Sequence, residues 1–394
     1  MGKIFKKLFY GAIITIASLF MSEKKATAQE IAFEFANPMT NSVSNTSTLD
    51  TATTLTGEGL EKIIKETGLA GSVLARLLET TILYSAESLF ATVSHELGHY
   101  RAAEKYGLNP CINIRLFANI FAHSGSCSLD WVDTPQASAQ IYAAGLNQNI
   151  QNSSKIWDEI QTGKHKVYDD LAFVTNQLLT LFYNWQGREE NGDYLHYMES
   201  MEDAGFELDR LRLGLNQSIS TLANTQLYNS IYSIVDFIVT GNRNPAPLTI
   251  KIGKAEITPP MFEYYMTDRG EFVNAKAIIN PREDTPIMIE YGRHLDETQP
   301  NTDVDINRFG LKLFDFEFKG IKFSPFAYMN LNDDFDYKGC YIGVDCKIPI
   351  TKDLAVTLGV AYSHNDVIHN SIRGVDEGLG VKFRITTNLN DSEK

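Results

Sequence analysis

The chain is short of cysteine, of basic residues and, beyond residue 28, of long apolar runs. Only four cysteines occur in 394 residues and none forms a C-x-x-C pair, which excludes a four-cysteine zinc knuckle. Thirty-five lysines and arginines stand against 49 acidic residues, a net charge of −14, so general nucleic-acid binding is excluded. After residue 28 no segment holds 18 uninterrupted apolar residues, so no helix of the mature chain is expected to span a membrane.

The hydrophobic content is 43%, which is typical of a folded protein and not of a disordered one. A length of 394 residues is enough for about two to three domains, each with a core of its own. The cysteines form two local pairs, Cys111 with Cys127 and Cys340 with Cys346, each of which would close a hairpin in an oxidising compartment. Because four cysteines allow three connectivities, the pairing stays open.

The first 28 residues have the three parts of a secretory signal. Three lysines lie within the first seven residues, an apolar run follows at 8–21, and Ala-Thr-Ala at 26–28 matches a cleavage site. We predict cleavage after Ala28 and export to the periplasm or outer membrane of a Gram-negative-type envelope. The alternative, an uncleaved membrane anchor, is disfavoured because the run is shorter than the ~20 residues that a spanning helix needs.

A flexible leader and a helical region are expected after the signal. Residues 29–56 are rich in Ser, Thr and Asn, which is typical of a flexible leader. From 57 to 245 apolar residues recur at steps of three and four, which indicates a helical domain. The pattern predicts a helix ending near Gly107, a β-hairpin at 111–128, a helix opened by Pro135, and helices at 165–186, 191–205 and 208–240.

The last third of the chain alternates with a period of two. Residues 246–394 contain about eight strand-length segments with short connections, which predicts an antiparallel β-meander or an eight-stranded barrel. The expected fold class is therefore α+β: an N-terminal helical zincin-like domain with a small β-hairpin, then this β-domain. The segment LAVTLGVAYS at 354–363 suits either a lipid-facing exterior or an ordinary soluble core, so outer-membrane association through the β-domain stays open.

One short motif carries chemistry: residues 95–99 read HELGH inside a helical pattern. Histidines four residues apart lie on one face of a helix, so His95 and His99 can bind one metal ion. Zinc suits two imidazoles and a third protein ligand, with the fourth position left for water. Glu96 lies beside that position and would act as general base while the water attacks a carbonyl. The alternative is a solvated helix face with no ion.

The stretch HELGHYRAAEKYG, the expected hairpin and a helix with AAGLNQN resemble, over residues 85–155, the metal-binding core of the site-two protease family of zinc metalloproteases. That family carries a Gly-Pro-x-x-Asn element after the hairpin, of which Gly145 and Asn149 remain here and the proline does not. The resemblance implies a catalytic role for Asn149, which would hydrogen-bond the substrate or the developing oxyanion. The family's spanning helices have no counterpart, so cleavage within a membrane is not expected.

Asp193 is the predicted third metal ligand. It follows an Asn-Gly turn and begins a helix downstream of AAGLNQN, which matches the order of the family's aspartate. An aspartate directly after a turn is also a common helix N-cap, so that interpretation stays open. The alternative ligands are His196, His123, Glu202 and Glu207.

These features predict an exported zinc metallopeptidase that hydrolyses peptide bonds in protein or peptide substrates, with Glu96 as general base. The alternative is a non-enzymatic cell-envelope β-barrel or binding protein, in which a metal is structural or absent. No nucleic-acid partner is expected. The glutamate beside the histidines favours the enzyme, because a structural zinc site normally fills its fourth position with a protein ligand.

Overall fold

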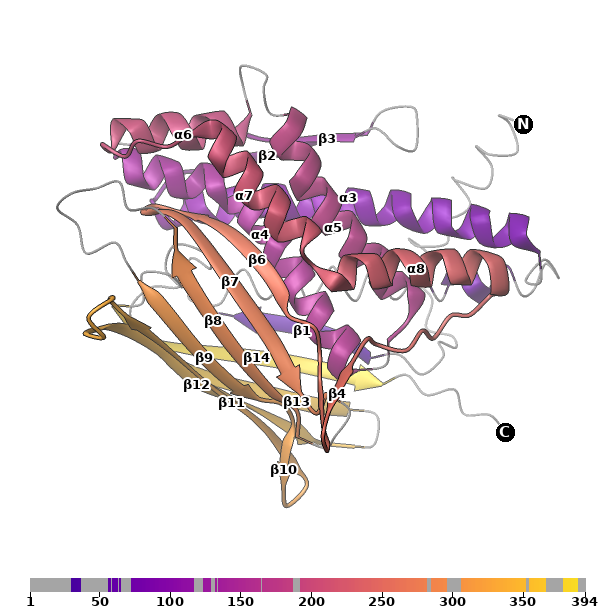
Figure 1. The fold of residues 1–394 in the computed structure, drawn as a ribbon. Helices are drawn as coiled ribbons and strands as arrows, with labels where there is room; N and C mark the ends of the chain where they lie inside the picture. The colour runs from indigo at the N-terminus through magenta and orange to yellow at the C-terminus, as the bar shows by residue number, and fades with distance from the viewer. Residues whose placement is uncertain are drawn as a thin grey trace.

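The protein is α+β, with helices gathered over one face of a curved sheet (Figure 1). The computed structural model describes residues 30–36, 56–57, 59–62, 64, 72–116, 123–128, 132, 134–163, 165–186, 192–281, 285–295, 306–351, 354–365 and 378–388. The expected signal at 1–28 lies outside the described residues. Within the part of the chain that is described, no helix is both long and apolar enough to cross a bilayer.

The helical layer precedes most of the sheet in the chain. Its described helices are α3 (Val73–Lys105), α4 (Pro135–Thr162), α5 (Val167–Gln186), α6 (Asp193–Asp203), α7 (Arg210–Leu222) and α8 (Thr225–Thr240). Side-chain caps set several starts, since the hydroxyl of Ser72 accepts from the amide of Ala75 and the hydroxyl of Thr134 accepts from Ala137. Pro135 occupies the first turn of α4, where no amide hydrogen is needed.

The single helix expected at 208–240 is wrong, because Ala223 and Asn224 divide it into α7 and α8. The carboxamide of Asn224 is hydrogen-bonded to the backbone of Phe262, accepting from its amide at 2.5 Å and donating to its carbonyl oxygen at 2.9 Å. The position of the break between the two helices is therefore set by a contact with a strand and not by the helices themselves. The apolar spacing continues across the break, so the local pattern gave no sign of it.

All strands described after residue 249 belong to one antiparallel sheet. They are β4 (Ile250–Ile252), β5 (Ala255–Ile257), β6 (Met261–Thr267), β7 (Gly270–Ile279), β8 (Ile287–His294), β9 (Asn307–Leu313), β10 (Phe316–Phe318), β11 (Ile321–Leu331), β12 (Tyr337–Pro349), β13 (Leu354–His364) and β14 (Gly378–Asn388). With β1 (Glu30–Ala36) the sheet has twelve strands in the order β1-β14-β13-β12-β11-β9-β8-β7-β5-β4, with β10 beside β11 and β6 beside β7.

The sheet is open, so the meander interpretation is confirmed and the closed eight-stranded barrel is wrong. Among the described residues, no pairing joins β1 at one edge to β4 or β6 at the other. The physical reason lies in the core, where α4 and α5 occupy the concave side of the sheet. Trp157 of α4 and Phe173 of α5 share one buried cluster with Ile278, Met288 and strand residues further along the sheet. This cluster combines residues from both sides of residue 245.

Part of the expected flexible leader is a strand. Glu30–Ala36 form β1, which pairs antiparallel with β14 from Glu30 opposite Asn388 to Ala36 opposite Lys382. In the sequence EIAFEFA large apolar residues alternate with glutamate or alanine, which favours a strand over a coil. The Ser-, Thr- and Asn-rich composition of the segment that follows is what predicts a flexible leader, and it does not extend to these seven residues.

The expected hairpin is confirmed by β2 (Cys111–Leu116) and β3 (His123–Ser128), which pair antiparallel. The side chains of Cys111 and Cys127 lie outside the described residues. Cys340 and Cys346 are free thiols. Both lie on β12, six residues apart, and at about 3.3 Å per residue a strand holds them far beyond disulfide reach.

Candidate metal centre

The HELGH motif lies in the second half of α3, a helix of 33 residues. His95 and His99 are one turn apart and are 1% and 3% exposed, and Glu96 between them is 4% exposed. A solvated helix face is therefore not what α3 presents here. Buried imidazoles need partners, and theirs come from α4 and α6.

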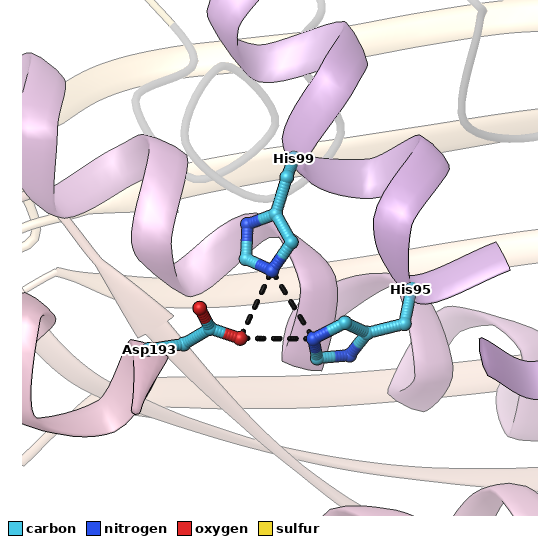
Figure 2. A group of neighbouring side chains, drawn as sticks. All are labelled: His95, His99 and Asp193. Atoms are coloured by element: carbon cyan, nitrogen blue, oxygen red, sulfur yellow. Dashed lines mark hydrogen bonds and ion pairs between the residues drawn. The ribbon is translucent and has the colours of Figure 1, made fainter. Parts of the chain in front are cut away.

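Asp193 completes a compact group with the two histidines (Figure 2). Its Oδ2 lies 2.9 Å from Nε2 of His95 and 3.0 Å from Nε2 of His99, and the two Nε2 atoms are 3.1 Å apart. Asp193 is the first residue of α6 and does not cap it, since the N-cap is Gly192 and has no side-chain hydrogen bond. The structure thus brings together the three residues predicted to share an ion.

The spacing of these atoms suits a small cation. Zinc bonds of about 2.0–2.2 Å in tetrahedral geometry place neighbouring ligand atoms about 3.3 Å apart. The observed separations of 2.9, 3.0 and 3.1 Å are close to that value. Two neutral nitrogens and one carboxylate oxygen leave one coordination position for another group. The group of His95, His99 and Asp193 could therefore hold a metal ion.

Hydrogen bonds behind the ligands orient both rings. Nδ1–H of His99 donates to the carbonyl oxygen of Ile141 in α4 at 2.7 Å, which leaves the Nε2 lone pair facing His95 and Asp193. Nδ1 of His95 lies 3.3 Å from the carboxamide nitrogen of Asn149. The carboxamide oxygen of Asn149 is buried and has no hydrogen-bond partner among the described residues. Turning the carboxamide by 180° would let that oxygen accept from Nδ1–H and free Nε2 for a cation.

Gly145 makes the space in which the group sits. A Cβ added at this position would lie 2.3 Å from Nε2 of His99 and 2.6 Å from Nε2 of His95. The sequence offered a signal for it, because a glycine inside a helix lowers helix stability and needs a packing or functional reason. The resemblance points to Gly145 only as part of the family element and does not predict its steric role.

Charges in the group are strongly coupled. Burial by itself would raise the pKa of Asp193, but the neighbouring His99 and His95 outweigh it and hold the pKa far below its usual range. Burial likewise acts to lower the pKa of His99, and Asp193 reverses this and raises it to about 9. Burial raises the pKa of Glu96, although both histidines oppose the shift. The metal-free group therefore keeps an excess proton that a cation would displace.

Tyr183 of α5 is a neighbour that the sequence analysis missed. Its ring lies over His95 with centroids 4.9 Å apart, and its hydroxyl is hydrogen-bonded to Asp193. Burial, with Asp193 next, raises the pKa of this phenol, so it stays neutral and donates to the carboxylate. In sequence it is one aromatic residue in an apolar helical run, and nothing there marks it out.

The alternative third ligands lie elsewhere. His196 pairs with Glu199, with Nδ1 and Oε2 3.1 Å apart, and its ring stacks on Tyr142. Glu202 and Glu207 are exposed, and neither joins the group. The side chain of His123 lies outside the described residues.

Comparison with known proteins adds no relative. The assignment of this centre therefore depends on its geometry and on the chemistry of its side chains. No protein-family model, curated protein or solved structure matches the chain.

Proposed function

We propose that the protein is an exported zinc metallopeptidase, with a zincin-like arrangement of α3, α4 and α6 around the ion. The observation that carries the proposal is the buried group of three ligand atoms with Glu96 beside it. His95, His99 and Asp193 would hold the ion, and Glu96 would be the general base. The resemblance to the site-two protease core over residues 85–155 supports peptide bonds in proteins or peptides as the substrate.

The residues divide the work between binding and proton transfer. When bound, zinc supplies Lewis-acid chemistry, lowering the pKa of a water and polarising a carbonyl oxygen. Glu96 takes the proton of the attacking water at its carboxylate and passes it to the leaving amine. Burial that raises the pKa of Glu96 makes this carboxylate a better proton acceptor near neutral pH.

The surrounding polar groups hold this arrangement in place. The Ile141 carbonyl and Tyr183 fix His99 and Asp193 respectively, so that ligand rotation is restricted. Asn149, which is fully buried and beside His95, is placed to orient that ring. A direct hydrogen bond from Asn149 to substrate or oxyanion remains part of the proposal and requires a carbonyl to enter beside His95.

A structural metal site is the second candidate. It is favoured by the deep burial of the ligands, since the side chains of His95 and His99 are only 2% and 4% exposed. In that case the ion would fasten α3 to α6 without any reaction. Glu96 distinguishes the two candidates, because a structural site does not need it.

Substitution of Glu96 by glutamine tests the proposal. Zinc content by elemental analysis and hydrolysis of a fluorogenic peptide mixture and casein would be measured for wild type, Glu96→Gln and Glu199→Gln. Glu199 is an exposed matched control on α6. We expect one zinc per chain in all three, with hydrolysis reduced at least about a hundredfold only in Glu96→Gln, because general-base groups contribute about 10²–10⁴-fold. Full activity in Glu96→Gln would refute the assigned role.

A further inference from the structure

The side of the sheet that faces the helices carries buried charged residues. Lys276 of β7 lies 2.8 Å from Asp158 of α4 and 3.3 Å from Glu263 of β6, and its side chain is 2% exposed. On neighbouring strands, Arg308 pairs with Glu290 at 3.5 Å. The inward face thus carries buried ion pairs beside the apolar cluster around Trp157, and α4 covers both.

The opposite, outward face of the sheet is apolar and open. Every second residue is apolar, counting from the first, in 287–291 of β8, 309–313 of β9, 323–329 of β11, 342–348 of β12, 356–362 of β13 and 379–383 of β14. We name these outward residues the apolar band. Leu311, Val360 and Val381 in it are 49%, 46% and 51% exposed, and no charged side chain interrupts it.

Strand register makes the apolar band continuous. Ile289 stands opposite Leu311, Ile342 opposite Tyr362, and Val360 opposite Val381. Residues directly opposite one another on the same face of paired strands are in contact range, so the band runs unbroken from β8 to β14. Soluble monomers rarely expose contiguous apolar patches of more than a few hundred Å².

Aromatic residues and polar groups border the apolar band at both ends. At one end Tyr291 and Phe309 pack together, with centroids 5.3 Å apart, and beyond them Arg293 pairs with Asp333 at 3.2 Å. At the other end Phe318 of β10 is 57% exposed, and the ammonium of Lys319 lies 5.5 Å from its ring centroid. Aromatic residues next to charges at both ends of an apolar face are typical of surfaces that meet two lipid–water interfaces.

The height and curvature of the apolar band fit lipid better than a second protein. Seven residues of β12 or β13 rise roughly 20 Å, before the aromatic residues of β10 are added, and lipid-facing bands are about 25 Å tall. Figure 1 shows the sheet curving around the helices, so the outward face is convex. Two convex faces touch over a narrow strip, whereas fluid hydrocarbon follows any outline.

We propose that the apolar band is a lipid-contacting surface that lies against the hydrocarbon of a bilayer, with the helices and the metal centre held on the other side of the sheet. This goes beyond the proposed peptidase and does not depend on it. The placement would confine the centre to substrates near a membrane.

Fluorescence quenching by lipid tests the proposal directly. Val360→Trp would be made in the apolar band and Leu74→Trp on α3 as the control, because Leu74 is also apolar and is 79% exposed. The exported protein would be reconstituted with phosphatidylcholine vesicles carrying bromine on their acyl chains. We expect the added emission of Val360→Trp to be quenched severalfold and that of Leu74→Trp to be unchanged. Unquenched added emission from the vesicle-bound Val360→Trp variant would overturn the proposal.

Flotation gives a second measurement that does not need a tryptophan. Wild type and Leu74→Glu are expected to float with the vesicles, and Val360→Glu combined with Val381→Glu is expected to reduce the floating fraction about tenfold, because charges on a lipid-facing strand position oppose insertion. Far-UV circular dichroism and urea unfolding would verify that the double variant is folded. A wild type that stays in the aqueous fraction, or that forms a dimer which the double variant dissociates, would overturn the proposal.

Discussion

Replacing Gly145 by alanine should abolish metal binding while leaving the fold in place. The added methyl carbon would stand 2.3 Å from Nε2 of His99 and 2.6 Å from Nε2 of His95. Those distances are nearly the bond lengths of about 2.0–2.1 Å that a zinc ion makes to imidazole, so methyl and ion compete for one position. Overpacking of this kind costs typically about 1–3 kcal/mol, which a folded protein of this size can absorb.

The loss should be visible as a missing stabilisation by zinc. At a zinc concentration 100 times Kd, a single site stabilises the folded state by about 2.7 kcal/mol. Wild type should gain this amount in urea unfolding on addition of zinc, and Gly145→Ala should gain nothing. Isothermal titration would show one site per chain in wild type and none in the variant.

The neighbouring residue supplies the control. The control is Ala144→Gly, the reverse substitution one position earlier in α4. It should cost about 1 kcal/mol of helix stability. Its zinc-dependent gain should be that of wild type. Binding of one zinc by Gly145→Ala at unchanged affinity would refute the reasoning, because the ion would then have to lie elsewhere than between the two histidines.

Three further results are expected. Asp193 raises the pKa of His99 to about 9 in the metal-free protein, so zinc must displace a proton below that pH. Zinc affinity, measured by competition with a chelator, should therefore rise about tenfold per pH unit from pH 6.5 and level off near pH 9. A zinc affinity that does not change with pH would contradict this. By the same shift, the stabilisation of the metal-free protein by His99 is complete below pH 6.5 and is lost as the pH rises through about 9. Arg243→Leu should cost about 3–5 kcal/mol in urea unfolding, because it leaves the fully buried Glu79 unpaired, whereas adding Glu79→Leu should recover most of the loss. An equal loss of unfolding free energy in the single and the double variant would show that the unpaired charge of Glu79 is not the cause.

Two of the metal ligands could be predicted because their relative position is set by the helix that carries both. The spacing of His95 and His99 fixes their common direction on any helix, and helical periodicity around them is strong. Asp193 came from the order of turn and helix after AAGLNQN, and the structure places it within 3.0 Å of both imidazoles. By contrast, Tyr183 acquires its role only through the packing of α5 against α3, which no local pattern encodes.

The parts of the fold that escaped prediction are those decided by distant contacts. The break between α7 and α8 depends on the two hydrogen bonds between the carboxamide of Asn224 and the backbone of Phe262. Closure of the sheet was expected because exposed edges are unfavourable. The filling of its concave side by Trp157 and Phe173 keeps it open, and that depends on how two regions of the chain pack together.

The pairing of β1 with β14 joins strands that lie roughly 350 residues apart in the chain, since Glu30 stands opposite Asn388. Most other strand pairs of the sheet are neighbours in sequence, so only short loops have to close for them to form. The strand β1 therefore cannot dock until β14 has been made, and it is among the last of the described strands to pair. Joining residue 388 to residue 30 by a short linker, with new ends opened elsewhere, would turn the slowest contact of the sheet into a local hairpin and speed folding.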